Sequence, residues 1–240
     1  MSNKLSVIIP IWEKHELAVV HVRECMNSTR VPDEIIVVND GGEDDLKDKL
    51  KALQLKTKVI YAKILPPKIP WNYTGARNLG FWLSSGDFIS IEDQDHIPQR
   101  EYYAEALKAL EEHPESSRCK AKWRHEVNLE DIVSKPYEEW VSQGGRQAHH
   151  DCCILKRELY LKLKGYDEQF AGEYGWSNTN WRRRLALGGF DNTVASGIQY
   201  VVNAEKTRGL SYRNFRIAKK NKTMQSPIGI LNFMYEYCEL

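Results

Sequence analysis

The first hundred residues alternate between short apolar runs, rich in β-branched residues, and longer segments in which apolar residues recur at helical spacing. The four apolar runs are Leu5–Ile9, Glu34–Asn39, Lys58–Ala62 and Asp87–Ile91. Strands that are apolar on both faces and alternate with helices belong to mostly parallel sheets that helices cover on both sides. We therefore expect an α/β fold with a doubly wound, mostly parallel central sheet flanked by helices.

Helical spacing predicts a helix after each of the first three strands, and a less regular second half. The first three helices are expected from about Leu17 to Asn27, at Leu46–Leu53 and at Thr74–Ser85. Later helices are expected at Arg100–Glu112, Arg157–Leu163, Asn178–Leu187 and Tyr212–Leu240, the last one broken near Pro227–Gly229. Strands are expected at Arg118–Arg124 and Asp151–Lys156. Strict alternation in Arg118–Arg124 places four cationic side chains on one face of that strand.

Composition excludes several classes of protein. With 34 basic and 33 acidic side chains the formal charge is +1, which excludes a histone-like polycation and an acidic disordered tail. No apolar run approaches the roughly 20 residues that span a bilayer, and no secretory signal is readable. Five cysteines without a C-x-x-C pair argue against a disulfide framework and a zinc knuckle. We expect a single-core cytoplasmic protein with reduced thiols and no transmembrane segment.

The carboxyl ends of the predicted strands mark the candidate ligand site, because doubly wound sheets bind their ligands there. The segments at these ends are Pro10–Glu13, Asn39–Gly42 and Glu92–His96. Asp93 and Asp95 are two residues apart, so both carboxylates face one side if the backbone stays extended. Hard oxygen ligands of this kind suit Mg²⁺ or Mn²⁺ and, through the metal, a diphosphate. An isolated D-x-D motif is more often a solvated acidic turn.

Two other features accompany the D-x-D motif. Asp40 ends a strand with two glycines behind it, which lets backbone and carboxylate approach a ligand closely. Arg77 lies at the start of a helix, where an arginine suits a phosphate or a ring carbonyl. The alternative for Arg77 is an ion pair on the helix surface with Asp93 or Asp87.

Four motifs, in this order and spacing, resemble family 2 glycosyltransferases of the GT-A fold. They are Leu5–Pro10, Val37–Gly42, Gly75–Gly80 and Glu92–Asp95. Gly165–Phe170 and Trp181–Phe190 resemble later signatures of that family, so the resemblance covers about residues 4 to 195. It implies a GT-A domain over residues 1–200, with a donor half at 1–98 and an acceptor half at 99–200. Residues 201–240 are expected to form a basic, mainly helical C-terminal extension packed on the same domain.

The resemblance also implies a nucleotide-diphosphosugar donor, expected to be UDP-linked, and inversion at the transferred sugar. By this analogy the base and ribose pocket is lined by Pro10, Ile11, Trp12 and Glu13. Asp40 would hydrogen-bond the base beside Gly41, Arg77 would contact base or phosphate, and Asp93 would reach the ribose or the sugar. Asp95 would hold the Mn²⁺ or Mg²⁺ ion that bridges the diphosphate. His96 is either a second metal ligand or a capping or surface histidine.

The sequence departs from the family where a Glu-Asp pair supplies the general base of inverting members. The matching positions are Ser177 and Asn178, and neither side chain accepts a proton near neutral pH. A neighbouring carboxylate is one explanation, with Glu173 closest in sequence and Asp151 and Asp167 behind it, although Asp167 is more typical of a residue that braces a turn. An acceptor that needs little help is a second explanation. A nucleotide-sugar-binding protein with lost or weak transfer is the third.

The acceptor side is expected to include His150, Trp176 and Asn178. Adjacent histidines on an extended strand point to opposite faces, so at most one of His149 and His150 can face the site. The alternative for either is a hydrogen-bonded structural histidine. Residues 182–240 carry ten lysines and arginines against four acids, a local excess of +6. With the basic face at Arg118–Arg124, this favours an anionic acceptor such as a phosphate-bearing glycan, a lipid carrier or nucleic acid. A basic surface that is simply solvated is the interpretation that such charge excess more often has.

Overall fold

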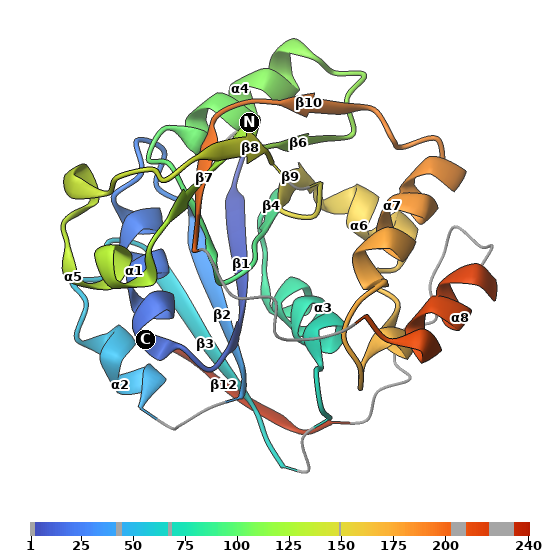
Figure 1. Cartoon of the computed structure of the whole chain (residues 1–240), viewed down its shortest axis with the longest axis horizontal. Helices are drawn as coiled ribbons and strands as arrows, with labels where there is room; N and C mark the ends of the chain where they lie inside the picture. Colours follow the sequence, from blue (N-terminus) through green and yellow to red (C-terminus); the bar gives the residue numbers. More distant parts are fainter. Residues whose placement is uncertain (1–2, 42–44, 67–68, 149, 203–209, 221–232) are drawn as a thin grey trace.

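The computed structural model describes residues 3–41, 45–66, 69–148, 150–202, 210–220 and 233–240. Its largest element is an eight-stranded sheet in the order β10-β6-β9-β4-β1-β2-β3-β12 (Figure 1). The parallel centre of this sheet consists of β1 (Leu5–Trp12), β2 (Glu34–Gly41), β3 (Lys58–Ile64) and β4 (Phe88–Ile91). The four strands predicted from the apolar runs are therefore confirmed as neighbours in one mostly parallel sheet.

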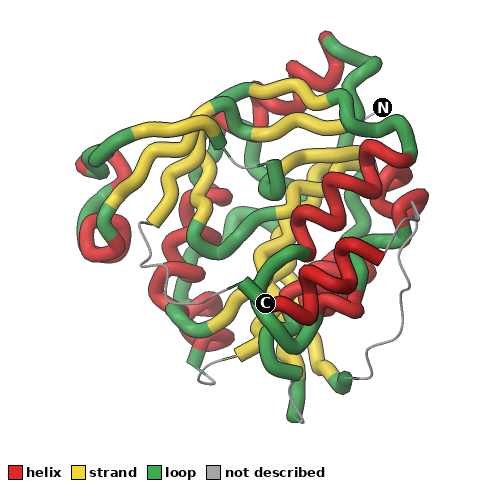
Figure 2. The backbone as a smooth tube through the Cα atoms, turned by 45° about the vertical axis from the view of Figure 1, so that its right-hand side comes forward, coloured by secondary structure: helices red, strands yellow, loops and turns green. Residues whose placement is uncertain are grey.

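Helices cover both faces of this sheet (Figure 2). One face packs against α1 (His15–Met26), α2 (Leu46–Lys51) and α4 (Tyr102–Glu112), and the other against α3 (Tyr73–Leu83), α6 (Arg157–Leu163) and α7 (Ser177–Leu187). In β1, Val7 and Ile9 belong to the core under α1, whereas Ile8 belongs to the core under α3. Successive side chains of a strand alternate between faces, so a strand buried on both sides is apolar throughout.

Helix α3 approaches the sheet closely at Gly80. A Cβ atom at Gly80 would lie 2.4 Å from Cγ2 of Ile8 and 3.3 Å from Cγ2 of Val38. No larger residue fits there without displacing the helix or these strands. The close contact holds α3, the helix that carries Tyr73 and Arg77, directly against β1 and β2.

A second sheet of four strands lies beyond the end of β4, in the order β5-β11-β7-β8. Its strands are β5 (His96–Pro98), β11 (Ile198–Val202), β7 (Trp123–Val127) and β8 (Gly145–Gln147). With α5 (Leu129–Ser134) and the 3₁₀ turn η1 (Tyr137–Glu139), it encloses a small core around Ile97, Val127 and Ile132. Because β5 begins at His96, the acidic turn at residues 93–95 connects the two sheets.

The prediction of one strand over Arg118–Arg124 with a basic face is wrong. The segment is two strands in different sheets: β6 (Arg118–Lys120) pairs with β9 (Cys153–Lys156) and β10 (Thr193–Ala195), whereas β7 joins the second sheet. Arg118 and Lys120 are each 4% exposed, so they do not form a solvated surface. Alternation of residue types identifies the extended backbone but does not reveal where a chain leaves one sheet for another.

The C-terminal prediction is correct for α8 (Tyr212–Lys220) and wrong for Tyr235–Glu239. The latter residues form β12, which pairs antiparallel with β3 at the edge of the main sheet. The predicted break at Pro227–Gly229 lies outside the described residues. An alternating Tyr-Glu-Tyr-Cys-Glu segment suits an edge strand, where one face packs on the sheet's neighbours and the other meets water.

Among the described residues, no helix is long and apolar enough to cross a membrane.

Candidate functional site

The ends of β1 and β2 meet at one edge of the main sheet. The register between them shifts after Ile11, which places Trp12 opposite Gly41. A Cβ atom at Gly41 would lie 2.7 Å from the Trp12 ring, so the glycine makes room for the indole. Asp40, the neighbour of Gly41, is 4% exposed. Gly42, the second glycine of the predicted segment, lies outside the described part of the chain.

Gln94 joins the acidic turn to the loop after β1. The backbone N–H of Trp12 donates to Oε1 of Gln94 at 2.6 Å, and Nε2 of Gln94 donates to the carbonyl of Glu13 at 3.2 Å. Glu13 has a positive φ of 55°, a conformation that a non-glycine residue adopts at some cost in free energy. The amide between the two aspartates therefore holds the predicted donor segment against the acidic turn, a role that the motif itself does not indicate.

Asp93 pairs with a buried arginine. The Arg77 guanidinium donates to Oδ1 of Asp93, and the Tyr73 hydroxyl donates to the same oxygen at 2.5 Å. The guanidinium also lies 4.0 Å from the centroid of the Tyr73 ring and 4.7 Å from that of Tyr166. Burial alone would raise the pKa of the Asp93 carboxyl. The positive charges of Arg77 and His96, together with hydrogen bonds from Tyr73 and Cys152, outweigh burial and hold this pKa well below its usual range. Asp93 is therefore a carboxylate.

This pairing corresponds to the alternative interpretation of Arg77, except that the pair is not on the helix surface. Arg77 is 1% exposed, so its guanidinium meets Asp93, Tyr73 and Tyr166 rather than solvent. The side chain of Asp93 is 22% exposed. Arg77 thus holds the Asp93 carboxylate from the buried side, and the rest of the carboxylate stays partly exposed to solvent.

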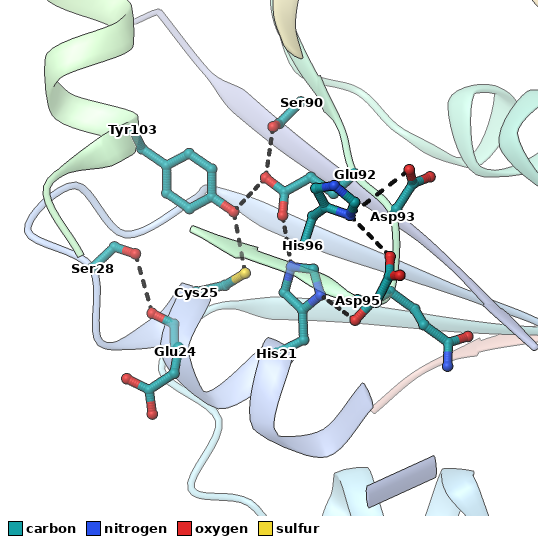
Figure 3. A network of polar contacts seen from close by, with 11 residues as sticks. His21, Glu24, Cys25, Ser28, Ser90, Glu92, Asp93, Asp95, His96 and Tyr103 are labelled. Atoms are coloured by element: carbon teal, nitrogen blue, oxygen red, sulfur yellow. Dashed lines mark hydrogen bonds and ion pairs between the residues drawn. The ribbon is translucent and has the colours of Figure 1, made fainter. Parts of the chain in front are cut away.

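Asp95 and Asp93 both approach the imidazole of His96. Nδ1 of His96 lies 2.9 Å from Oδ1 of Asp95 and 3.9 Å from Oδ2 of Asp93 (Figure 3). Burial lowers the pKa of His96, but the two carboxylates raise it above its usual value. Asp95 is the more open of the pair, with 35% of its side chain exposed. The turn therefore brings both carboxylates to one point although β4 itself ends at Ile91.

These donors fit a divalent cation of the Mg²⁺ or Mn²⁺ type. Such ions take one or two carboxylates and keep the remaining positions for water and substrate phosphate, and Asp93 and Asp95 are partly exposed carboxylates that converge. Cys152 lies with Asp93 and His96 in a cluster whose ligand atoms are all within 4.8 Å of one another. Burial raises the pKa of the Cys152 thiol well above its usual range, so the sulfur stays protonated and is a poor ligand.

A buried network supports the acidic turn from the side of α1 and α4 (Figure 3). Glu92, which is fully buried, accepts hydrogen bonds from the hydroxyls of Tyr103 and Ser90, each at 2.8 Å. Nε2 of His21 lies 2.6 Å from Oε2 of Glu92, and Nδ1 of His21 lies 3.3 Å from the carbonyl of Gln94. His21 thus contacts the turn at a side chain and at the backbone. Helical spacing predicted His21 on the same helix face as Leu17 and Val20, and no motif around it indicated a contact with the turn.

The second sheet contributes Arg124, whose guanidinium is close enough to His96 for its positive charge to oppose protonation of the imidazole. Burial, together with Arg146 on the neighbouring strand, lowers the pKa of Arg124. Among the described residues, Nε of Arg124 has no hydrogen-bond partner. The alternation in Arg118–Arg124 predicted a basic strand face that includes Arg124, and the structure instead brings this residue to the acidic turn.

The three carboxylates considered as the general base have different surroundings. Asp167 is 2% exposed and accepts a hydrogen bond from the backbone N–H of Gln169 at 3.1 Å, which caps the turn η2 (Glu168–Phe170). Glu173 is exposed, and its carboxylate accepts a hydrogen bond from the Ser211 hydroxyl. Asp151 is 5% exposed and lies 3.8 Å from Nε of Arg182. Asp151 also adjoins Cys152, which reaches Asp93.

The positions of the missing Glu-Asp pair begin α7. Trp176 precedes the helix with a φ of 69° and packs on Phe215 of α8 at 4.8 Å between ring centroids. Oδ1 of Asn178 is buried and makes no hydrogen bond with any described residue. His150 is partly buried, and burial together with Lys120, Arg118 and Arg182 lowers its pKa. His149 lies outside the described residues.

The predicted basic surface at the C-terminus is smaller than expected. Arg184 is 1% exposed and hydrogen-bonds the carbonyl of Leu163 inside the protein. Lys206, Arg208 and Lys222 lie outside the described residues. The exposed cations that remain on α7 and α8 are Arg182, Arg183, Arg213, Arg216, Lys219 and Lys220.

The sequence of residues 6–159 matches the family model described as glycosyl transferase family 2. This match covers more than half of the chain. The chain belongs to glycosyltransferase family 2. Among curated relatives, the probable glycosyltransferase YdaM of Bacillus subtilis is 26% identical over 191 residues, which are 71% of this chain and 44% of YdaM. An uncharacterized glycosyltransferase of Rickettsia bellii is 30% identical over 109 residues, 45% of this chain and 15% of that protein.

The solved structures that resemble this family 2 chain confirm its fold. S. aureus TarS 1–349, in complex with UDP, has a TM-score of 0.65 at 16% identity over 90% of this chain and 63% of TarS. The mannosyltransferase PcManGT from Pyrobaculum calidifontis, in complex with GDP-Man and Mn²⁺, has a TM-score of 0.58 at 17% identity over 90% of this chain and 60% of that one. The GT-A fold expected from the motifs is therefore the observed fold. The chain spans less than two thirds of these proteins and less than half of the two curated relatives.

Proposed function

We propose that the chain is a metal-dependent glycosyltransferase that moves a sugar from a UDP-linked nucleotide-diphosphosugar to an acceptor, with inversion. The observation that carries this proposal is the pair of partly exposed carboxylates, Asp93 and Asp95, that converge at the carboxyl end of β4. A pair of this kind attracts a divalent cation and, through it, a diphosphate. The UDP complex of TarS and the complex of PcManGT with GDP-Man and Mn²⁺ support the choice of ligand class.

The metal would be held by Asp95, with Asp93 and His96 next to it. When bound, it supplies positive charge that stabilises the diphosphate leaving group as the glycosidic bond breaks. The chain's own residues prepare the site. Arg77 orients Asp93, and Gln94 fixes the loop after β1 against the turn.

The nucleotide would lie across the ends of β1 and β2. Pro10, Ile11, Trp12 and Glu13 form one side of this edge, and Asp40 and Gly41 form the other. Asp40 is suited to accept a hydrogen bond from an N–H of the base. Arg77 is buried behind Asp93, so we propose that it acts on the donor through Asp93 rather than by direct contact.

For the general base we propose Asp151. A base must lie within hydrogen-bond reach of the attacking hydroxyl, and this hydroxyl must approach the sugar near Asp93. Asp151 adjoins Cys152, whose sulfur clusters with Asp93. Glu173 lies on an exposed loop tied to Ser211, and Asp167 is occupied as a cap. Neither contact connects Glu173 or Asp167 to Asp93, so Asp151 is the better candidate for the base.

The alternative function is binding of a nucleotide sugar with lost or weak transfer. The observation that favours it is the start of α7, where Ser177 and Asn178 replace the expected carboxylates and the amide oxygen of Asn178 is buried. An amide side chain does not take up a proton near neutral pH. A binding protein of this kind would use the same donor site as the proposed transferase but would transfer the sugar slowly or not at all.

Release of UDP from a panel of UDP-sugars with Mn²⁺ tests the proposal, because water replaces an unidentified acceptor. We expect turnover that D95A lowers by about 100-fold or more, since it removes a metal ligand. D48A, which removes an exposed aspartate on α2, should leave turnover unchanged. UDP binding without turnover on any sugar would favour the binding protein instead. If the chain neither bound UDP nor released it from any UDP-sugar, both the transferase and the binding function would be contradicted.

A further inference from the structure

Two cationic side chains of β6 are buried on the sheet face that α7 covers. Arg118 and Lys120 point to the same side of the strand, because they are two residues apart, and each is 4% exposed. Their partners across the ladder, Leu155 and Cys153, belong to the core under α6 and α7. Burying a charge costs free energy unless a counter-charge or sufficient hydrogen bonds accompany it.

The hydrogen bonds found in the structure only partly satisfy these cations. Nζ of Lys120 donates to the carbonyl of Ala148 at 3.2 Å, and Nε of Arg118 donates to the hydroxyl of Thr193 at 2.8 Å. Nη1 of Arg118 is buried with no hydrogen-bond partner among the described residues. Burial, followed by repulsion from Arg118, lowers the pKa of Lys120.

Two more groups complete a cationic cluster at the end of β6. Arg182, on the first half of α7, has 46% of its side chain exposed and lies 3.8 Å from Asp151. His150 is near enough to Lys120, Arg118 and Arg182 for all three to lower its pKa. Within the described part of the chain, Asp151 is the carboxylate that these contacts bring to the cluster. Three basic side chains, those of Arg118, Lys120 and Arg182, thus accompany one acid.

The cluster lies beside the predicted reaction centre. Asp151 contacts Arg182 and adjoins Cys152, whose sulfur approaches Asp93. Asp151 thus links the two groups of residues, through its contact with Arg182 at the start of α7 and through its neighbour Cys152 at the acidic turn. A ligand group held there would place a neighbouring hydroxyl at Asp151.

We propose that Arg118, Lys120, His150 and Arg182 form a subsite for a phosphate group of the acceptor. Phosphate has the charge and the acceptor oxygens that several converging guanidinium, ammonium and imidazole donors require. The identification of the ligand as part of an acceptor rests on the proposed transferase function, whereas binding of the anion does not. The buried, unpaired cations are retained because the bound phosphate neutralises them.

Titration calorimetry with inorganic phosphate, in EDTA, tests the subsite. Without a divalent cation Asp93 and Asp95 repel phosphate, so heat of binding reports the cationic cluster. We expect saturable binding by the wild-type chain and affinity at least about tenfold lower in K120M and in R182Q, each of which removes one charged donor. K122M removes an exposed lysine two residues from Lys120 and should bind phosphate like the wild type. Acetate should bind at least about tenfold more weakly than phosphate.

Thermal melting in phosphate-free buffer gives an independent readout. K120M should melt at or above the wild-type temperature, because a buried charge without a counter-ion is removed and its methylenes are kept. R182Q replaces an exposed side chain, so its result stands even if K120M folds poorly. Equal phosphate affinity in K122M, K120M and R182Q, no saturable binding by the wild type, or acetate binding as tight as phosphate would overturn the proposal.

Titration of UDP with Mn²⁺ on the same variants separates the subsite from the proposed function. UDP affinity should be unchanged in K120M and R182Q, since neither residue lies at the ends of β1 and β2. Loss of UDP binding by the wild type, with phosphate binding retained, would contradict the transferase and leave the anion site standing.

Discussion

The guanidinium of Arg77 and the carboxylate of Asp93 form an ion pair in which the arginine is fully buried and the aspartate reaches the surface. Tyr73 donates to the same carboxylate and also stacks on the guanidinium. One carboxylate oxygen is thus fixed from the protein side, which leaves the other edge of Asp93 directed to His96 and the acidic turn. This arrangement orients a donor-site carboxylate before any ligand binds.

Replacing Arg77 by methionine should destabilise the fold and weaken donor binding. Removing one partner of a buried ion pair costs about 3–5 kcal/mol, because the other charge stays behind. R30M removes the cation of the surface pair between Arg30 and Asp33 and should cost about 1 kcal/mol or less. Urea denaturation measures both free energies of unfolding. Equal losses in the two variants would contradict the buried role of Arg77.

Gly80 should tolerate alanine poorly, because Ile8 occupies the space of the new methyl group. We expect G80A to lower the free energy of unfolding by about 1–3 kcal/mol. The test is a double-mutant cycle with I8A, which removes the contacting Cγ2 atom. G80A should cost at least about 1 kcal/mol less in the I8A background than in the wild type. Additive losses would show that α3 is not held by this contact.

His21 should affect both the fold and the metal-dependent step. H21F keeps a ring in the helix α1 but removes the contacts with Glu92 and with the carbonyl of Gln94. We expect a loss of about 1–3 kcal/mol in the free energy of unfolding, since Glu92 loses a buried partner. We also expect a weaker apparent affinity for Mn²⁺, because the turn that carries Asp95 loses a support.

The matched control for H21F is S28A. The Ser28 hydroxyl donates a hydrogen bond to the carbonyl of Glu24 at the C-terminal end of α1. It makes no hydrogen bond with the acidic turn (Figure 3). S28A should change stability modestly and leave the Mn²⁺ dependence of UDP binding as it is. If both variants changed this dependence equally, the network would be a general stability element rather than a support for the turn.

The general base can be assigned by comparing D151N with E173Q. If Asp151 is the base, D151N should lower UDP release by about 100-fold to 10,000-fold while UDP affinity stays within about twofold. E173Q should keep the wild-type rate, because Glu173 lies on an exposed loop bonded to Ser211. The reverse outcome would assign the base to Glu173. Wild-type rates in both variants would indicate an acceptor that needs no carboxylate.

Much of the fold could be predicted because the central strands are apolar on both faces. β1 to β4 lie between two helical layers, so each strand is visible in the sequence as a mostly apolar run, which Ser6 in β1 and Ser90 in β4 interrupt once each. The strands at the edges of the two sheets were harder to predict. Arg118–Arg124 alternates as one strand would, yet β6 and β7 belong to different sheets, and β12 was assigned to a helix. Edge strands are short, and their partners are far away in the sequence.

The candidate site was partly predictable for a related reason. Carboxylates at strand ends can be read locally, which places Asp40, Asp93 and Asp95 at one edge of the sheet. Their supports cannot be read locally. His21 and Glu92 are 71 residues apart, and Trp12 and Gln94 are 82 apart. Cys152 and Arg124 reach the turn from other strands, and no pattern around them indicates that they do.

The most direct test of the central claim is calorimetric titration of UDP with and without Mn²⁺ on the wild-type chain and on D95N. If Asp93 and Asp95 form a metal-bridged diphosphate site, Mn²⁺ should tighten UDP binding by at least about tenfold in the wild type, and D95N should abolish that gain. UDP binding that is equally tight without the metal, or a metal effect that survives in D95N, would contradict the account.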